Sequence, residues 1–378
     1  MMQVQAAKQA FVPVNEPLLN GNEKKYLNEC IDTGWISSEG PFVHKFEELF
    51  AARMHRKHGI AVANGTAALE VAVRALELEP GSQIIMPTFT IISCAIAAVR
   101  AGCQPVFVDA DAQTWNMNVA AIEQKITPRT KAIMVVHIYG LPTDMEPVLE
   151  LAKKYDLKII EDAAQAIGQT YNDKPCGSFG DISIVSFYPN KHVTTGEGGM
   201  VMTDDDHLAE RSRSLRNLCF KKERRYVHDE LGYNYRMTNL QAAVGVAQLE
   251  QLDLFLKKKR LIGQFYTTHL RRIGYLELPL ERTPYADNLY WVYGIVLKDS
   301  VSFDAFEMMK LLEQRGIGTR AFFWGLHEQP VFTQHEACVE QFPVAQRLAR
   351  RGLYIPSGIA ITQEQMDRVV QAIKEIFS

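Results

Sequence analysis

The sequence predicts an α/β protein built on a mostly parallel sheet, followed by a smaller α+β region. Short apolar runs rich in Val and Ile alternate with helix-like stretches from about residue 59 to residue 204. Runs that are apolar on both faces are typical of parallel strands covered by helices on each side. After residue 205 the alternation gives way to longer helical patterns. This change predicts a second, smaller unit toward the C-terminus.

Each predicted strand of the large sheet is a short apolar run next to turn residues or a helical pattern. The strands are expected at 59–64, 83–88, 104–109, 132–138, 157–162, 181–187 and 200–204. Apolar residues at helical spacing predict the connecting helices at 66–78, 92–101, 118–125 and 145–155. The strand–helix–strand order is the reason to expect a parallel-rich sheet.

The later part of the chain has a different pattern. Helices are expected at 208–218 and, long and interrupted, at 239–270, before a proline-containing connection at 274–284. The remaining expected elements are a strand at 290–297, a helix at 303–315, a strand at 319–323 and an amphipathic helix at 363–377. We therefore expect an N-terminal tail at 1–12, a large domain at 13–250 and a small C-terminal domain at 251–378.

Composition excludes several classes of protein. The chain has 378 residues and a net charge of −3, which argues against a dedicated nucleic-acid binder. The six cysteines form no Cys-x-x-Cys pair, so we expect free thiols in a reducing compartment. The segment 1–12 lacks the apolar core of a signal peptide, and the uncharged stretch 80–99 contains too many polar residues and prolines for a membrane span. We expect a soluble, cytoplasmic protein.

Polar residues that follow the strands are the candidates for chemistry, because ligands of open α/β sheets lie beyond the carboxyl ends of the strands. Asp162 ends a very apolar strand, where it either serves a ligand or caps the next helix. Lys191 lies between a strand and the glycine-rich segment 194–199, and it is either functional or a solvated surface lysine. Gly65 and Thr66 open a helix whose N-terminus either binds an anion or is simply capped.

Together these three features point to pyridoxal 5′-phosphate (PLP). The helix N-terminus suits the phosphate, and the carboxylate of Asp162 would keep the pyridine nitrogen protonated. The amine of Lys191 would form a Schiff base with the aldehyde. We expect no metal, because His137 and His192 have no metal-ligand spacing.

Four segments of the chain are distinctive as a set and in their order: Glu161-Asp162-Ala163-Ala164-Gln165, Ser186-Phe187-Tyr188-Pro189-Asn190-Lys191, Thr194–Gly199 and Gly232-Tyr233-Asn234-Tyr235-Arg236-Met237-Thr238-Asn239. In these segments the chain resembles the DegT/DnrJ/EryC1/StrS family of sugar-nucleotide aminotransferases, and the resemblance covers essentially its full length. The resemblance implies an aspartate-aminotransferase-like PLP fold (fold type I), in which the large domain binds the cofactor. Within the family, 33–40 and 232–239 are most similar to members that act on a GDP-linked sugar.

The resemblance implies roles for individual residues. Lys191 would bind the cofactor and move a proton between cofactor and substrate, and Asp162 would pair with the pyridine nitrogen. Gln165 would lie near the ring hydroxyl. The phosphate would be bound by Gly65, Thr66 and Ser186 and, from the neighbouring subunit, by Asn234. That last contact implies a homodimer with shared active sites, and further pairing into tetramers stays open.

Other positions depart from the family pattern or are candidates for substrate binding. Many relatives have Tyr or Trp stacked on the cofactor where this chain has Ile91, and Phe89 is a candidate to compensate. His192 follows an intact Lys191, which favours transamination over the dehydration catalysed by relatives with histidine in the lysine position. The candidate substrate residues are Trp35, Arg320 and His327; an arginine can pair with a carboxylate or a diphosphate.

The expected reaction is transfer of the amino group of glutamate to C4 of a keto-sugar nucleotide, in the first place GDP-4-keto-6-deoxy-mannose, for polysaccharide synthesis such as that of O-antigen. One alternative is the same chemistry on a UDP- or dTDP-linked keto-hexose. Another is a DNA-binding regulator on this fold, against which stand the net charge of −3, the lack of an evident helix-turn-helix and the intact Lys191 and Asp162. The basic runs 221–225 and 257–260 either attract nucleotide phosphates or form solvated faces. A third is a carbon–sulfur PLP enzyme, which would need a mobile nucleophilic cysteine, and Cys338 is the candidate.

Overall fold

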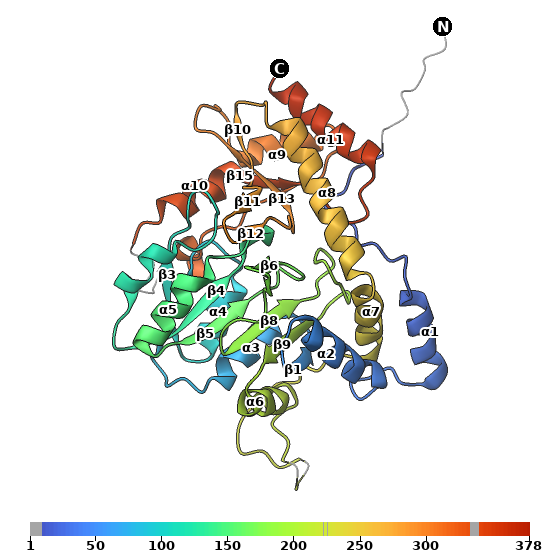
Figure 1. Ribbon diagram of the computed structural model, residues 1–378, viewed down its shortest axis with the longest axis vertical. Helices are drawn as coiled ribbons and strands as arrows, with labels where there is room; N and C mark the ends of the chain where they lie inside the picture. The colour runs from blue at the N-terminus through green and yellow to red at the C-terminus, as the bar shows by residue number, and fades with distance from the viewer. Residues whose placement is uncertain (1–9, 222, 225, 333–339) are drawn as a thin grey trace.

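The computed structural model describes residues 10–221, 223–224, 226–332 and 340–378. Most of the predicted N-terminal tail, part of the first basic run and Cys338 therefore lie outside the described residues. Figure 1 shows a large sheet flanked by helices, with the C-terminal part of the chain, in orange and red, packed at one end of it. No helix in the described ranges combines the length and the apolar character that crossing a membrane requires.

The large sheet has seven strands in the order β1-β9-β8-β5-β4-β2-β3. They are β1 (His58–Val62), β2 (Gln83–Pro87), β3 (Gln104–Val108), β4 (Thr130–Val136), β5 (Lys158–Asp162), β8 (Ile182–Ser186) and β9 (Gly199–Thr203). Neighbours from β8 to β3 pair in parallel, and β9 runs antiparallel to both β1 and β8. The predicted mostly parallel sheet is confirmed, and every predicted run overlaps one of these strands.

Helices cover both faces of the sheet. They are α1 (Glu23–Thr33), α2 (Pro41–Arg53), α3 (Gly65–Ala75), α4 (Ser93–Arg100), α5 (Met145–Tyr155), α6 (Asp206–Arg216) and α7 (Asn239–Leu249). Along β2 the side chains alternate between two cores. Ile84 and Met86 pack in the cluster that contains α3 and α4, whereas Ile85 packs in the cluster that contains α5. Burial on both faces explains why the strands read as continuous apolar runs.

The predicted helix at 118–125 is wrong. This segment forms two 3₁₀ turns, at Val119–Ala121 and Glu123–Lys125. The backbone is extended at Ile126. Pro128 follows two residues later, and a proline disfavours helical backbone in the residue before it, here Thr127. The segment before this point is too short to form several successive turns of α-helix, and a very short helix is unstable.

The C-terminal part contains a second sheet of four strands, in the order β10-β13-β15-β14. Its elements are α8 (Leu252–Leu270), β10 (Leu276–Glu277), β13 (Tyr293–Leu297), α9 (Ala305–Glu313), β14 (Arg320–Ala321), α10 (Pro343–Arg351), β15 (Gly352–Ile355) and α11 (Gln363–Ile376). Two further pairs of short strands form small sheets of their own. They are β6 (Thr170–Tyr171) with β7 (Lys174–Pro175) and β11 (Arg282–Thr283) with β12 (Ala286–Asp287).

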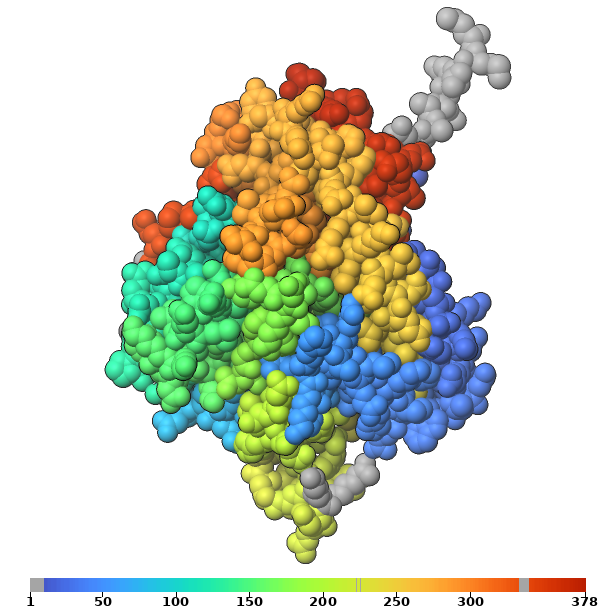
Figure 2. Space-filling model, viewed as in Figure 1, coloured from blue at the N-terminus to red at the C-terminus, as the bar shows by residue number. Residues whose placement is uncertain are grey.

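The long helix α8 begins at Leu252, next to the predicted domain boundary, and rises from α7 to the second sheet (Figure 1). The N-terminal segment also reaches this sheet, because Val12 bridges Ile317 and the carbonyl of Val14 accepts from the amide of Ser357. Figure 2 shows the C-terminal part seated closely on the rest of the molecule. The division into two domains at residue 251 stays a prediction.

Candidate active site

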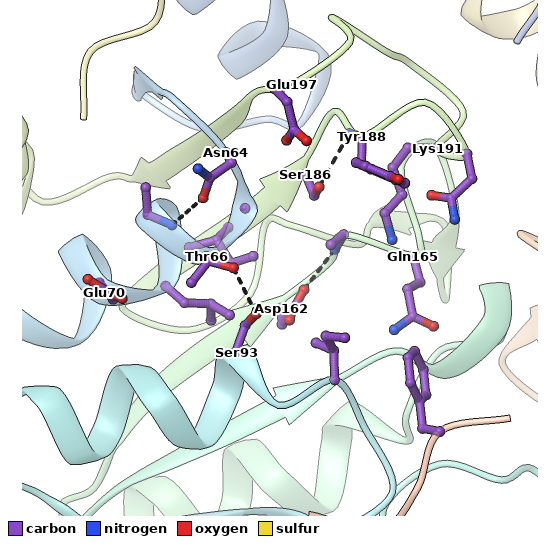
Figure 3. Close-up of a pocket in the computed structure, with 18 of the residues that line it drawn as sticks. Asn64, Thr66, Glu70, Ser93, Asp162, Gln165, Ser186, Tyr188, Lys191 and Glu197 are labelled. Carbon is purple, nitrogen blue, oxygen red and sulfur yellow. Dashed lines mark hydrogen bonds between the residues drawn. The ribbon is translucent and has the colours of Figure 1, made fainter. Parts of the chain in front are cut away.

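A cavity of about 700 Å³ opens at the carboxyl ends of β5 and β8 and the N-terminus of α3. Asp162, Lys191, Gln165 and Ser186 line it, together with Gly65 and Thr66. Figure 3 shows Lys191 and Gln165 pointing toward the same space as Asp162, with Thr66 and Ser186 also bordering it. Residues from three separate segments of the sequence thus meet in one cavity, where an α/β sheet is expected to bind its ligand.

Lys191 lies in the loop that follows β8, in a turn closed by its own amide and the carbonyl of Tyr188. Its side chain borders the cavity while its amine is enclosed by protein, and this burial lowers the pKa of Lys191 to about 7. The negative charge of Asp162 acts in the opposite direction on that pKa. The Nζ atom lies 3.6 Å from the ring centroid of Trp291. A lysine of this kind is neutral often enough at neutral pH to act as a nucleophile or a base.

Asp162 is the last residue of β5 and is 2% exposed. Its Oδ1 atom accepts from the amide of Ala164 at 2.9 Å, and its Oδ2 atom accepts from the thiol of Cys94 at 3.6 Å. Burial raises the pKa of Asp162, and the amide of Ala164 and the charge of Lys191 oppose that rise. The carboxylate therefore favours a positively charged partner within the cavity.

The N-terminus of α3 forms a cradle against β8. Asn64 caps the helix by accepting from the amide of Ala67 at 2.8 Å, so the predicted capping is present. The first-turn amides of Gly65 and Thr66 have no partner within the helix and remain for an anion. A Cβ atom on Gly65 would lie 2.7 Å from the Cβ of Ser186, so only glycine allows this close approach. The cradle thus fits a phosphate group between the helix and Ser186.

Gln165 complements this arrangement. Its Oε1 atom accepts from the amide of Tyr139 at 2.9 Å, which leaves its NH₂ group as the donor. A donor in the cavity suits an oxygen such as the ring hydroxyl of PLP. The phosphate cradle, the buried carboxylate, this donor and the lysine together fit PLP.

At position 91 the cavity wall is formed by an isoleucine, which cannot stack on a cofactor ring as an aromatic side chain does. Ile91 lines the cavity and is 41% exposed. Phe89 does not compensate, because it is fully buried and packs against Tyr139, Phe322 and Phe323.

The proposed substrate and partner residues lie outside the set that lines this cavity. Trp35 is half-exposed, and Arg320 lies exposed on β14 next to Ala321, which does line the cavity. His327 is buried, and its Nδ1 atom is 2.7 Å from the hydroxyl of Thr88. Asn234 is exposed, in the segment between α6 and α7. The roles of these four residues stay predictions, and the contacts of His327 are those of a packing residue.

Several cavity residues come from the C-terminal part of the chain and were missed by sequence reasoning. They are Trp291, Ala321, Phe323 and Tyr354. Trp291 precedes β13, and Tyr354 lies on β15. No local motif marks these positions, because tertiary packing alone brings them to the cavity.

A buried cluster behind Asp162 contains His137, Glu161 and Cys176, whose ligand atoms lie within 4.8 Å of one another. The Nδ1 atom of His137 accepts from the amide of Thr143, so its Nε2 atom donates to Glu161 at 2.9 Å. Glu161 also accepts from the amides of Gly177 and Phe179. These bonds explain the cluster as a brace for the end of β5.

We expect Glu161→Gln to lower the free energy of unfolding by about 1–3 kcal/mol. The carboxylate of Glu161 accepts from the amides of Gly177 and Phe179 through its two oxygens. Glutamine replaces one oxygen by an NH₂ group, so one of these amides loses its acceptor. Urea unfolding monitored by circular dichroism measures the loss, with Glu48→Gln on the exposed face of α2 as the control. Equal stability of the two variants would contradict the bracing role.

Comparisons with known proteins identify the family of the chain. A model of the DegT/DnrJ/EryC1/StrS aminotransferase family matches residues 17–374. The chain is 41% identical over 368 residues to a GDP-perosamine synthase of Escherichia coli O157:H7, covering 97% of this chain and 99% of that protein. It is 40% identical over 321 residues to a UDP-N-acetyl-3-dehydro-alpha-D-glucosamine 3-aminotransferase of Acidithiobacillus ferrooxidans, covering 84% of each.

A similar solved structure is S. venezuelae DesV in complex with ketimine intermediate. It shares 31% sequence identity with this chain at a TM-score of 0.88, and the match covers 94% of each. The predicted fold class is therefore confirmed, as is the expected cofactor class. The chain belongs to the DegT/DnrJ/EryC1/StrS aminotransferase family, and it is a PLP-dependent sugar aminotransferase.

Proposed function

We propose that the protein transfers the amino group of glutamate to C4 of GDP-4-keto-6-deoxy-mannose and so forms GDP-perosamine. The observation that carries the proposal is the meeting of Lys191, Asp162 and the α3 N-terminus in one cavity. The GDP-linked sugar is favoured because the GDP-perosamine synthase is similar over 97% of the chain, against 84% for the UDP-sugar enzyme. An amino sugar of this kind would serve polysaccharide synthesis such as that of O-antigen.

The residues that would hold PLP follow from the geometry. Gly65, Thr66 and Ser186 would bind its phosphate, Asp162 its ring nitrogen and Gln165 its ring hydroxyl. When bound, PLP supplies an aldehyde that carries the amino group and a ring that takes up electrons. Lys191, with its pKa lowered to about 7, can hold the cofactor covalently and can take up or give a proton at Nζ.

Substrate binding would use the mouth of the cavity. Tyr188, Phe323 and Tyr354 line it, and a sugar ring packs well against aromatic side chains. Arg320, on the strand beside Tyr354, would bind the carboxylate of glutamate or the diphosphate of the nucleotide. Trp35 would border the sugar from the loop that follows α1.

We also propose that the protein works as a homodimer with shared active sites. Part of the chain between α6 and α7 projects from the body of the molecule (Figures 1 and 2). Asn234 is exposed in the same connection, where it bridges Asn217 directly after α6. On a second copy, the amide of Asn234 would donate to the cofactor phosphate. Nucleotide sugars and glutamate are cytoplasmic metabolites, which supports a cytoplasmic location.

The test is a panel of keto-sugar nucleotides incubated with purified enzyme, PLP and glutamate. We expect mass spectrometry to identify GDP-perosamine and 2-oxoglutarate, with kcat/KM at least about tenfold above that for UDP- and dTDP-linked keto-hexoses. GDP-mannose, which has no keto group, is the matched control and should give no product. A higher kcat/KM with a UDP- or dTDP-linked substrate would replace the proposed sugar and leave the aminotransferase chemistry intact.

A further inference from the structure

We propose that Trp291 is a positioning residue that places the amine of Lys191 for covalent attachment of PLP. The inference rests on the role of Lys191 in the proposed function, and it adds a residue from the C-terminal part of the chain to that machinery. Trp291 lines the cavity, is 5% exposed and has its ring centroid 3.6 Å from the Nζ atom of Lys191.

The indole ring can hold the amine without trapping it. An ammonium is attracted to the negative face of the ring, and a neutral amine can donate an N–H to the same face. The ring presents no lone pair in a fixed direction, so the amine remains able to leave it for the cofactor. A carboxylate at this distance would instead hold the lysine charged and unreactive.

Trp291 is itself held by one hydrogen bond at its ring and one at its backbone. Its Nε1 atom donates to the carbonyl of Asn190 at 2.7 Å, and Asn190 directly precedes Lys191. The indole is thus tied to the turn that carries the lysine. On the other side, the carbonyl of Trp291 accepts from the Nζ atom of Lys259 at 2.9 Å.

Lys259 is a buried anchor on α8. It is 2% exposed, and burial lowers its pKa to about 7. Its amine also donates to the carbonyl of Ser357, so one side chain joins the chain before β13 to the chain after β15. Lys259 thus connects the ends of two strands of the second sheet to Trp291, and Trp291 contacts Lys191.

The experiment separates position from charge. PLP is added to full-length protein stripped of cofactor, and the rate of attachment is followed by visible absorbance at saturating PLP across a pH series. The rates are compared at the plateau that each variant reaches at high pH, where its amine is neutral, so the comparison reports the placement of the amine. Affinity for pyridoxamine phosphate, which has no aldehyde, measures the phosphate and ring contacts without Lys191.

We expect Trp291→Leu to slow attachment by about tenfold or more, because misplacement of a reacting group weakens orientation. The dissociation constant of pyridoxamine phosphate should stay within about twofold of the wild-type value, and Trp291→Phe, which keeps an aromatic face, should recover most of the rate. Trp115→Phe is the matched control, since Trp115 is equally buried but does not line the cavity.

Attachment by Trp291→Leu at the wild-type rate would overturn the proposal. So would an equal loss of pyridoxamine phosphate affinity, which would mark a purely structural role. If Trp291→Leu does not fold, Trp291→Met takes its place as a variant without an aromatic face, and attachment by it at the wild-type rate would overturn the proposal. Neither sugar nor glutamate takes part, so failure of the proposed substrate leaves this test valid.

Discussion

Replacement of Lys191 by alanine is expected to abolish repeated turnover and the visible absorbance of lysine-bound PLP. Lys191 is the cavity-lining amine with a pKa lowered to about 7, so its removal takes away both the covalent link and the base at that place. Absorbance spectra and mass spectrometry of the product, each with glutamate and the keto-sugar nucleotide, provide the measurement.

Two further variants make the result specific. Lys191→Arg keeps a positive charge but no nucleophilic amine, and it should be as inactive as the alanine variant. Lys153→Ala, on the exposed side of α5, should retain both absorbance and turnover. Continued cycling by Lys191→Ala would contradict the assigned role.

Replacement of Asp162 by asparagine is the second large effect. We expect kcat to fall by about 10²-fold or more, because a neutral amide cannot stabilise a positive charge on the ring nitrogen. Asparagine keeps an oxygen for the amide of Ala164, so the end of β5 should stay in place. Steady-state kinetics gives kcat, and the visible spectrum checks that PLP remains attached.

The control for this variant is Asp156→Asn, since Asp156 is exposed at the end of α5. It should leave kcat unchanged. A kcat for Asp162→Asn within about threefold of the wild type would show that the ring nitrogen does not depend on this carboxylate.

Features that depend on neighbouring residues in the sequence could be predicted. The apolar runs locate the strands of the large sheet, and strand ends locate Asp162 and Lys191. The antiparallel direction of β9 was not predicted. Its connection from β8 is the loop that carries Lys191, with no crossover helix of the kind a parallel strand requires.

Features that depend on distant parts of the chain escaped prediction. Trp291 and Tyr354 reach the cavity from the C-terminal part of the chain, and nothing in their local sequence indicates that approach. Phe89 illustrates the converse: its closeness to Ile91 in the sequence made it a candidate to contact the cofactor, but packing against Tyr139 and Phe322 buries it.

The most direct test of the account is to map the lysine that carries PLP. Borohydride reduces the C=N bond between lysine and cofactor to a stable amine, and peptide mass spectrometry then identifies the modified residue. Among the residues that the structure describes, two lysines have a pKa of about 7, Lys191 in the cavity and Lys259 on α8. We predict modification at Lys191 alone; modification at Lys259, or none at Lys191, would contradict the central claim.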